Sequence, residues 1–187
     1  MKMVITAVPE RVGYIAYLQE KLPNADWIID NQKRGAMNSF LKALKTLDND
    51  CGLLMQEDII LCENFETRVQ EQIDLRPEYF INFYSMRNDD LTIGSRWDNN
   101  FIANLCFYIP KNHANAIIDW HRDYWVPSNY EGNMPTSASD LLVRSYLKKK
   151  LQQKYWIVIP NLVDHRIGKS AIDKRRSSKR ISKTFKG

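Results

Sequence analysis

Short apolar runs alternate with helical periodicity over the first third of the chain, and this alternation limits the fold more than any other feature. Residues 3–7 (MVITA) and 27–29 (WII) are apolar and rich in β-branched side chains, which predicts strands. Apolar residues recur at helical spacing over 14–22 and again over 40–47, before a third apolar run at 52–61. The order β-α-β-α-β favours an α/β domain with a mainly parallel central sheet flanked by helices.

The rest of the chain continues this alternation. We expect helices over 65–75 and 113–124 and from Ser139, strands over 79–84, 101–109 and 155–159, a polar loop over 85–100 and an irregular loop over 125–137. A chain of 187 residues of which 44% are hydrophobic can bury a core of its own. We therefore expect one domain over residues 1–168, followed by a separate segment over 169–187.

That C-terminal segment is strongly basic. Residues 169–187 hold eight Lys or Arg and one Asp, a net charge of +7, while residues 1–168 sum to −2. Three interpretations stay open: a solvated terminus, a segment that folds back over a ligand, or an arm that binds a polyanion such as nucleic acid or an acidic membrane surface. Two apolar residues, Ile181 and Phe185, favour docking onto the body.

Cysteine spacing and hydropathy indicate the cellular compartment and the relation to membranes. Cys51, Cys62 and Cys106 form no CxxC pair, and we interpret them as reduced thiols of a cytoplasmic protein. No stretch of about 18 consecutive apolar residues is present, so we expect no membrane span.

Polar residues follow each of the first three predicted strands, at residues 9–11, 30–32 and 56–58. In open α/β sheets, ligands bind outside the carboxyl ends of the strands. Glu57 and Asp58 are costly to bury without a cation, and strand alternation would point them to opposite faces unless the chain has turned there. A divalent cation on a nucleotide diphosphate needs only one or two such carboxylates. The alternative is a pair of solvated turn acids.

A second segment, residues 159–170, combines groups that suit a metal and a phosphate. The His165 imidazole is a usual ligand for manganese-type and zinc-type ions, although a single histidine also serves structural roles. Gly168, Lys169 and Ser170 offer a close backbone approach, a cation and a hydroxyl to phosphate oxygens. The same trio also occurs in plain surface turns.

Together, four segments resemble the sequence pattern of small glycosyltransferases of the GT-A fold. They occur in the family's order and cover nearly the whole chain. The segments are residues 7–11 (AVPER), Asp30, residues 54–59 (LMQEDI) with 62–65 (CENF), and residues 160–165 (PNLVDH).

The resemblance implies a Rossmann-like GT-A catalytic domain over 1–168, with 169–187 packing on or near the donor site. It further implies a nucleotide-sugar donor, for which we expect a UDP-sugar, and a divalent metal, manganese or magnesium. The reaction would be hexosyl or pentosyl transfer to an acceptor hydroxyl.

Site residues carry over by position. Asp58 and His165 match metal ligands. The positions matching donor-binding ones are Val8, Arg11, Asp30, Gln56, Glu57, Lys169 and Ser170, with Arg175 and Arg180 added if the basic segment folds back. The departure is Gln56, where the family usually has the first acid of its metal motif; an amide can bond a ribose but supplies no charge.

Acceptor activation needs further groups. Asp140, at a predicted helix start, is the candidate catalytic base of an inverting reaction, or else an ordinary N-terminal helix acid. A retaining reaction stays open. Trp125 and Tyr130 are candidates for stacking on the acceptor.

A basic segment together with stacking aromatics would suit DNA as the acceptor. Phage-type enzymes of this kind glycosylate hydroxymethylated bases in DNA, so DNA is the acceptor to test first. The alternative from another class is a non-catalytic nucleic-acid-binding protein with an α/β body and a basic arm.

Overall fold

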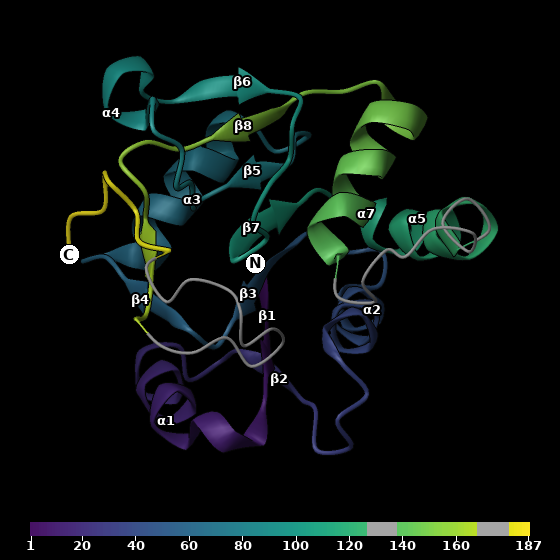
Figure 1. Cartoon of the computed structure of the whole chain (residues 1–187), viewed down its shortest axis with the longest axis horizontal. Coiled ribbons are helices and arrows are strands. Elements are labelled where there is room, and N and C mark those ends of the chain that lie inside the picture. Colours follow the sequence, from purple (N-terminus) through teal and green to yellow (C-terminus); the bar gives the residue numbers. More distant parts are fainter. Residues whose placement is uncertain (127–137, 168–179) are drawn as a thin grey trace.

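The computed structural model describes residues 1–126, 138–167 and 180–187, and it centres on a seven-stranded mixed sheet (Figure 1). In spatial order the strands are β2 (Asp26–Ile29), β1 (Lys2–Ala7), β3 (Gly52–Gln56), β7 (Cys106–Ile109), β5 (Ile81–Asn82), β8 (Tyr155–Ile157) and β6 (Arg96–Asp98). All but β7 and β6 run in the same direction. The predicted α/β fold with a mixed, mainly parallel Rossmann-like sheet is confirmed.

Helices cover both faces of the sheet. They are α1 (Val12–Lys21), α2 (Ala36–Leu47), α3 (Phe65–Leu75), α4 (Asp90–Ile93), α5 (His113–Trp120), which continues as a wider turn over His121–Trp125, and α7 (Ser139–Ser145), which continues over Tyr146–Leu151. Figure 1 shows α2, α5 and α7 on one side and α1 and α3 on the other. Side chains of β1 point alternately to the two faces of the sheet. Met3 and Ile5 pack in the core with α1 and α3, and Val4 packs in the core with α2, α5 and α7.

The third apolar run divides into two strands. The chain leaves the main sheet after Gln56 and turns at Glu57 and Asp58. It then forms β4 (Ile59–Leu61), which pairs antiparallel with β9 (Val163–His165) in a separate two-stranded sheet. This pairing sets His165 opposite Ile59, one residue beyond Asp58. Hydropathy did not predict β9, because its residues Val163–His165 include two polar side chains that are buried.

Other segments also differ from expectation, among them the predicted strand over 79–84, of which β5 covers Ile81–Asn82. The predicted polar loop over 85–100 contains α4 and the edge strand β6, which pairs antiparallel with β8. Ion pairs from Arg87 to Asp98 and from Arg96 to Asp90 hold this region, so hydrophobic periodicity does not mark it. The predicted strand over 101–109 begins only at Cys106.

The end of the basic segment, residues 180–187, is fixed to the body by hydrogen bonds. The Ser182 amide donates to Asp164 Oδ1 at 2.7 Å, and Asn161 Nδ2 donates to Ser182 Oγ at 2.7 Å. Of the two proposed apolar anchors, Phe185 packs against the core, whereas Ile181 is 41% exposed. Docking therefore depends on polar contacts and one aromatic side chain.

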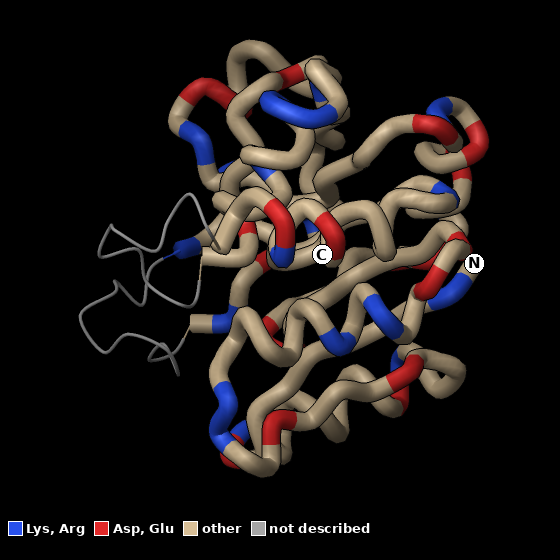
Figure 2. The backbone as a smooth tube through the Cα atoms, turned by 90° about the vertical axis from the view of Figure 1, so that its right-hand side faces the viewer, with Lys and Arg blue, Asp and Glu red and all other residues tan. Residues whose placement is uncertain are grey.

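Charge is interspersed over the described backbone, where Figure 2 shows both Lys or Arg and Asp or Glu spread over the tube. Cys51, Cys62 and Cys106 are free thiols, as expected. Within the three described ranges, no helix combines the length and apolar character that a bilayer crossing requires.

Candidate functional site

A cavity of about 920 Å³ opens at the carboxyl ends of β1, β2 and β3. Its size suits a nucleotide-sized ligand. The predicted site residues that line it are Val8, Arg11, Asp30, Gln56, Glu57, Asp58, Asp140, His165 and Arg180. The fold thus gathers groups from distant parts of the sequence at the edge where α/β sheets bind ligands. Their individual roles stay predictions.

The two adjacent acids converge on one arginine. Arg11 Nη1 lies 3.0 Å from Glu57 Oε1 and 2.7 Å from Asp58 Oδ2. The turn after β3 allows this, because Glu57 and Asp58 no longer alternate across a strand. Both acids are buried, at 6% and 5% exposure, which excludes the interpretation as solvated turn acids.

Burial and neighbouring charges shift the pKa values of the two acids in opposite directions. Burial, reinforced by the neighbouring Asp58 carboxylate, raises the pKa of Glu57 to about 7 despite the Arg11 guanidinium. Burial also acts to raise the pKa of Asp58, but the hydrogen bond with His165 and the charge of Arg11 lower it below its ordinary value. Asp58 is therefore the permanent anion of the pair, while Glu57 can hold a proton near neutral pH.

His165 has an imidazole with two distinct nitrogens. Nδ1 donates to the Arg166 carbonyl oxygen at 2.6 Å. Nε2 lies 3.2 Å from Asp58 Oδ2 and 3.1 Å from Arg180 Nη2. The carboxylate can only accept and the guanidinium can only donate, so Nε2 can satisfy one of them at a time.

Two buried polar atoms of this cluster lack a hydrogen-bond partner within the part of the chain that the structure describes. They are Asp58 Oδ1, an acceptor, and Arg180 Nε, a donor. Buried polar atoms are normally paired with protein groups or ordered water, so these two atoms are available to a ligand. The missing partners are a cation or proton for the carboxylate and an anion or other acceptor for the guanidinium.

Asp58 and His165 fit a divalent metal. The unpartnered Oδ1 is an available oxygen ligand, and a histidine that donates Nδ1–H to a carbonyl presents Nε2 to a metal. No group of three or more His, Cys, Asp or Glu side chains suited to a metal occurs among the described residues. A metal here would thus have two protein ligands and depend on phosphate and water for the others.

Gln56 is held by a residue that the sequence did not single out. Its Nε2 donates to the carbonyl oxygen of Asn104 at 3.3 Å and to Asn104 Oδ1 at 3.1 Å. Asn104 Nδ2 in turn donates to Ser139 Oγ at 2.7 Å. With Nε2 engaged, Gln56 has Oε1 to offer to a ligand hydroxyl. The sequence signal for Asn104 was its position as a polar residue inside an otherwise apolar run.

Asp30 has a local structural role as well as a place at the cavity. Its two carboxylate oxygens accept from the Arg34 amide at 2.9 Å and the Gly35 amide at 2.7 Å. Gly35 has φ of 91°, which L-residues rarely adopt, so the glycine permits this turn. Backbone hydrogen bonds lower the pKa of Asp30, which burial alone would raise.

Asp140 lies at the start of α7, as predicted, and lines the cavity. Its Oδ1 accepts from the Leu141 amide at 3.0 Å, which is typical of an acid in the first turn of a helix. Asp140 therefore lies at the predicted helix start, and its role as the catalytic base stays a prediction.

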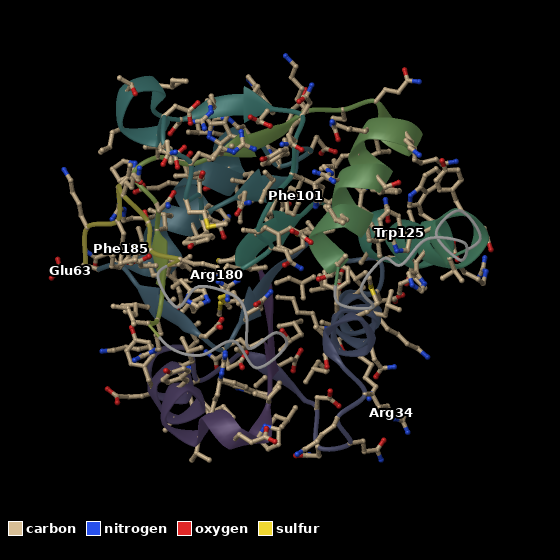
Figure 3. The ribbon with its side chains drawn as sticks, viewed as in Figure 1. Arg34, Glu63, Phe101, Trp125, Arg180 and Phe185 are labelled. Atoms are coloured by element: carbon tan, nitrogen blue, oxygen red, sulfur yellow. The ribbon has the colours of Figure 1, made fainter. Side chains whose placement is uncertain are left out.

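Of the two proposed acceptor aromatics, the structure describes only Trp125, and it does not line this cavity. Trp125 packs against the core under α2, α5 and α7 and is absent from the cavity lining. Figure 3 shows Trp125 beside α5, well separated from Arg180 near the middle of the molecule. Tyr130, Lys169, Ser170 and Arg175 lie outside the described residues.

The fold and this cavity together define a Rossmann-like α/β protein with a cavity lined by charged side chains at the carboxyl edge of its sheet. Among solved structures, the chain is similar in fold to A197 from STIV, with a TM-score of 0.53, 11% identity, and coverage of 90% of this chain and 87% of that one. A glycosyltransferase involved in the glycosylation of the major capsid of PBCV-1 aligns at a TM-score of 0.35, with 8% identity and coverage of 86% and 94%. No protein-family model and no curated protein matches the sequence.

Proposed function

We propose that the protein is a glycosyltransferase that takes a sugar from a nucleotide-diphosphate donor, expected to be a UDP-sugar. The supporting observation is the pair of orphaned atoms at the cavity, Asp58 Oδ1 and Arg180 Nε. A metal-bound diphosphate supplies a cation and an anion together, so it would complete both at once. The ordered sequence resemblance to GT-A glycosyltransferases supports the same ligand class.

In this proposal the arginines stabilise the leaving group. Negative charge develops on the nucleotide diphosphate as the sugar departs, and preorganised cations facing that charge lower the barrier. Arg180 offers Nε to a phosphate oxygen, while Arg11 fixes Asp58 in place. A divalent ion held by Asp58 and His165 would add further neutralisation of the diphosphate oxygens when bound.

The remaining polar groups would position the sugar and the acceptor. Gln56 Oε1 would accept from a donor hydroxyl, with Asn104 orienting the amide. Asp140, on the cavity wall, would take the acceptor proton in an inverting reaction. Hydroxymethylated DNA is the acceptor proposed for the first assay.

A donor screen tests this function. Each nucleotide sugar is incubated with the protein and Mn²⁺, and release of nucleotide diphosphate is measured by mass spectrometry. We expect one donor to be consumed and the same donor with Mn²⁺ to raise the melting temperature. Asp58→Ala should abolish that rise. Absence of any shift across the panel would overturn the proposal, and salt-sensitive DNA binding that is lost on deleting residues 171–187 would then favour a nucleic-acid-binding protein.

A further inference from the structure

Two groups lie within hydrogen-bonding distance of His165 Nε2, which can pair with one of them at a time. Arg180 Nη2 lies 3.1 Å away and can only donate to its lone pair, while Asp58 Oδ2, which also accepts from Arg11, lies 3.2 Å away and can only accept. A divalent ion bound between His165 and Asp58 would use the same lone pair that accepts from Arg180. The guanidinium and the metal therefore exclude each other at this atom.

The backbone of Arg180 is held independently of its side chain. Tyr84 donates its hydroxyl hydrogen to the Arg180 carbonyl oxygen, and Ser182 N–H bonds Asp164 Oδ1 at 2.7 Å. The guanidinium has one contact to His165, and its Nε has no hydrogen-bond partner within the described ranges. The side chain can thus exchange His165 for an anion by rotating its torsions, while residues 180–185 stay docked.

We propose that Arg180 couples metal binding to diphosphate binding by competing with the metal for His165 Nε2. This inference rests on the proposed function. Without nucleotide, the guanidinium occupies Nε2 and weakens metal binding. A diphosphate offers the guanidinium a better acceptor, a charged phosphate oxygen, and so frees Nε2 for the metal. By linkage the effect is reciprocal: metal and diphosphate each strengthen the binding of the other by the same factor.

Mn²⁺ titration with and without UDP tests this coupling, with bound Mn²⁺ read by loss of the free-ion electron paramagnetic resonance signal. In the wild type we expect UDP to tighten Mn²⁺ binding by about tenfold or more. Arg180→Met should tighten binding of Mn²⁺ alone by several-fold and shrink the effect of UDP. The matched control is Lys183→Met, which removes the same charge from the same segment. Its Nζ donates to Asn88 Oδ1 at 2.6 Å, and Lys183 does not line the cavity.

A double variant separates competition at His165 Nε2 from a general change in the electrostatic potential of the site. In a His165→Gln background, Arg180→Met should no longer tighten Mn²⁺ binding, because the contested imidazole is gone. Circular-dichroism melting confirms that each variant is folded. If Arg180→Met leaves Mn²⁺ affinity unchanged, or Lys183→Met raises it equally, the competition is refuted.

The outcomes also separate this inference from the proposed function. Donor turnover with no Mn²⁺ binding in any variant would overturn the coupling and leave the glycosyltransferase proposal standing. Tighter Mn²⁺ binding by Arg180→Met, with no nucleotide sugar bound or consumed, would support competition at His165 and contradict the glycosyltransferase.

Discussion

Glu57 and Asp58 are neighbours in the sequence whose carboxylates meet at a single nitrogen, Arg11 Nη1, at 3.0 and 2.7 Å. Two buried acids sharing one cation cannot both be fully compensated. The consequence is asymmetric ionisation: the pKa of Asp58 falls while burial and Asp58 raise that of Glu57 to about 7. At alkaline pH the ionised Glu57 carboxylate is unfavourable in the folded protein, and the free energy of unfolding measures this effect.

Glu57→Gln should stabilise the metal-free protein at alkaline pH. An acid whose pKa is higher when folded than the ordinary 4.5 binds more protons in the folded state, so wild-type stability is lost as pH rises from 4.5 to about 7. The shift corresponds to about 3 kcal/mol at most. Denaturant unfolding in EDTA should show the variant equal to wild type at low pH and more stable above neutrality. Glu71→Gln, the same change at an exposed site on α3, should show no such dependence.

Arg11→Met should destabilise the protein by about 3 kcal/mol, because it leaves two buried carboxylates side by side without their shared cation. Combining it with Glu57→Gln should recover part of the loss, since only Asp58 then remains charged. Unfolding free energies of the four proteins in this double-mutant cycle measure the coupling. Additive effects of the two substitutions on the free energy of unfolding would contradict the shared-cation geometry.

Gln56→Glu, which restores the acid common in GT-A enzymes, should destabilise the protein by about 1–3 kcal/mol at neutral pH. The Gln56 amide donates to two oxygens of Asn104, and a carboxylate has no hydrogen to offer them. The matched control is Gln72→Glu. Gln72 Oε1 accepts from Arg76 at 3.5 Å, so a carboxylate there keeps its partner. Equal effects of the two substitutions on thermal unfolding would refute the role assigned to Asn104.

Asp164→Ala should release residues 182–185 from the body. Asp164 Oδ1 accepts from the amides of His165 at 2.8 Å and Ser182 at 2.7 Å, and alanine cannot replace that oxygen. Hydrogen–deuterium exchange of the C-terminal peptide should become faster by about tenfold or more, the equivalent of 1.4 kcal/mol or more of lost protection. Asp164→Asn keeps an acceptor oxygen at the same place and should retain protection. Unchanged exchange in Asp164→Ala would show that other contacts suffice.

The first third of the chain could be predicted from hydrophobic pattern alone. Alternating apolar runs up to residue 56 produce β1, α1, β2, α2 and β3, because strands and helices with one buried face repeat at different periods. The pattern failed at β6 and β9, where ion pairs and buried polar residues such as Asp164 replace apolar contacts. It also could not show that Asn104, distant in sequence, would hold Gln56.

The sequence by itself determined the α/β class, the order of the early elements and the placement of Arg11, Asp30 and Asp58 just after strands. Those follow from local periodicity, since parallel strands align their carboxyl ends. Only the tertiary structure decided that a turn brings Glu57 and Asp58 to one arginine, and that β9 sets His165 between Asp58 and Arg180. Such contacts join residues as far apart as Asp58 and His165, 107 positions along the chain, and their distances depend on how the whole chain packs.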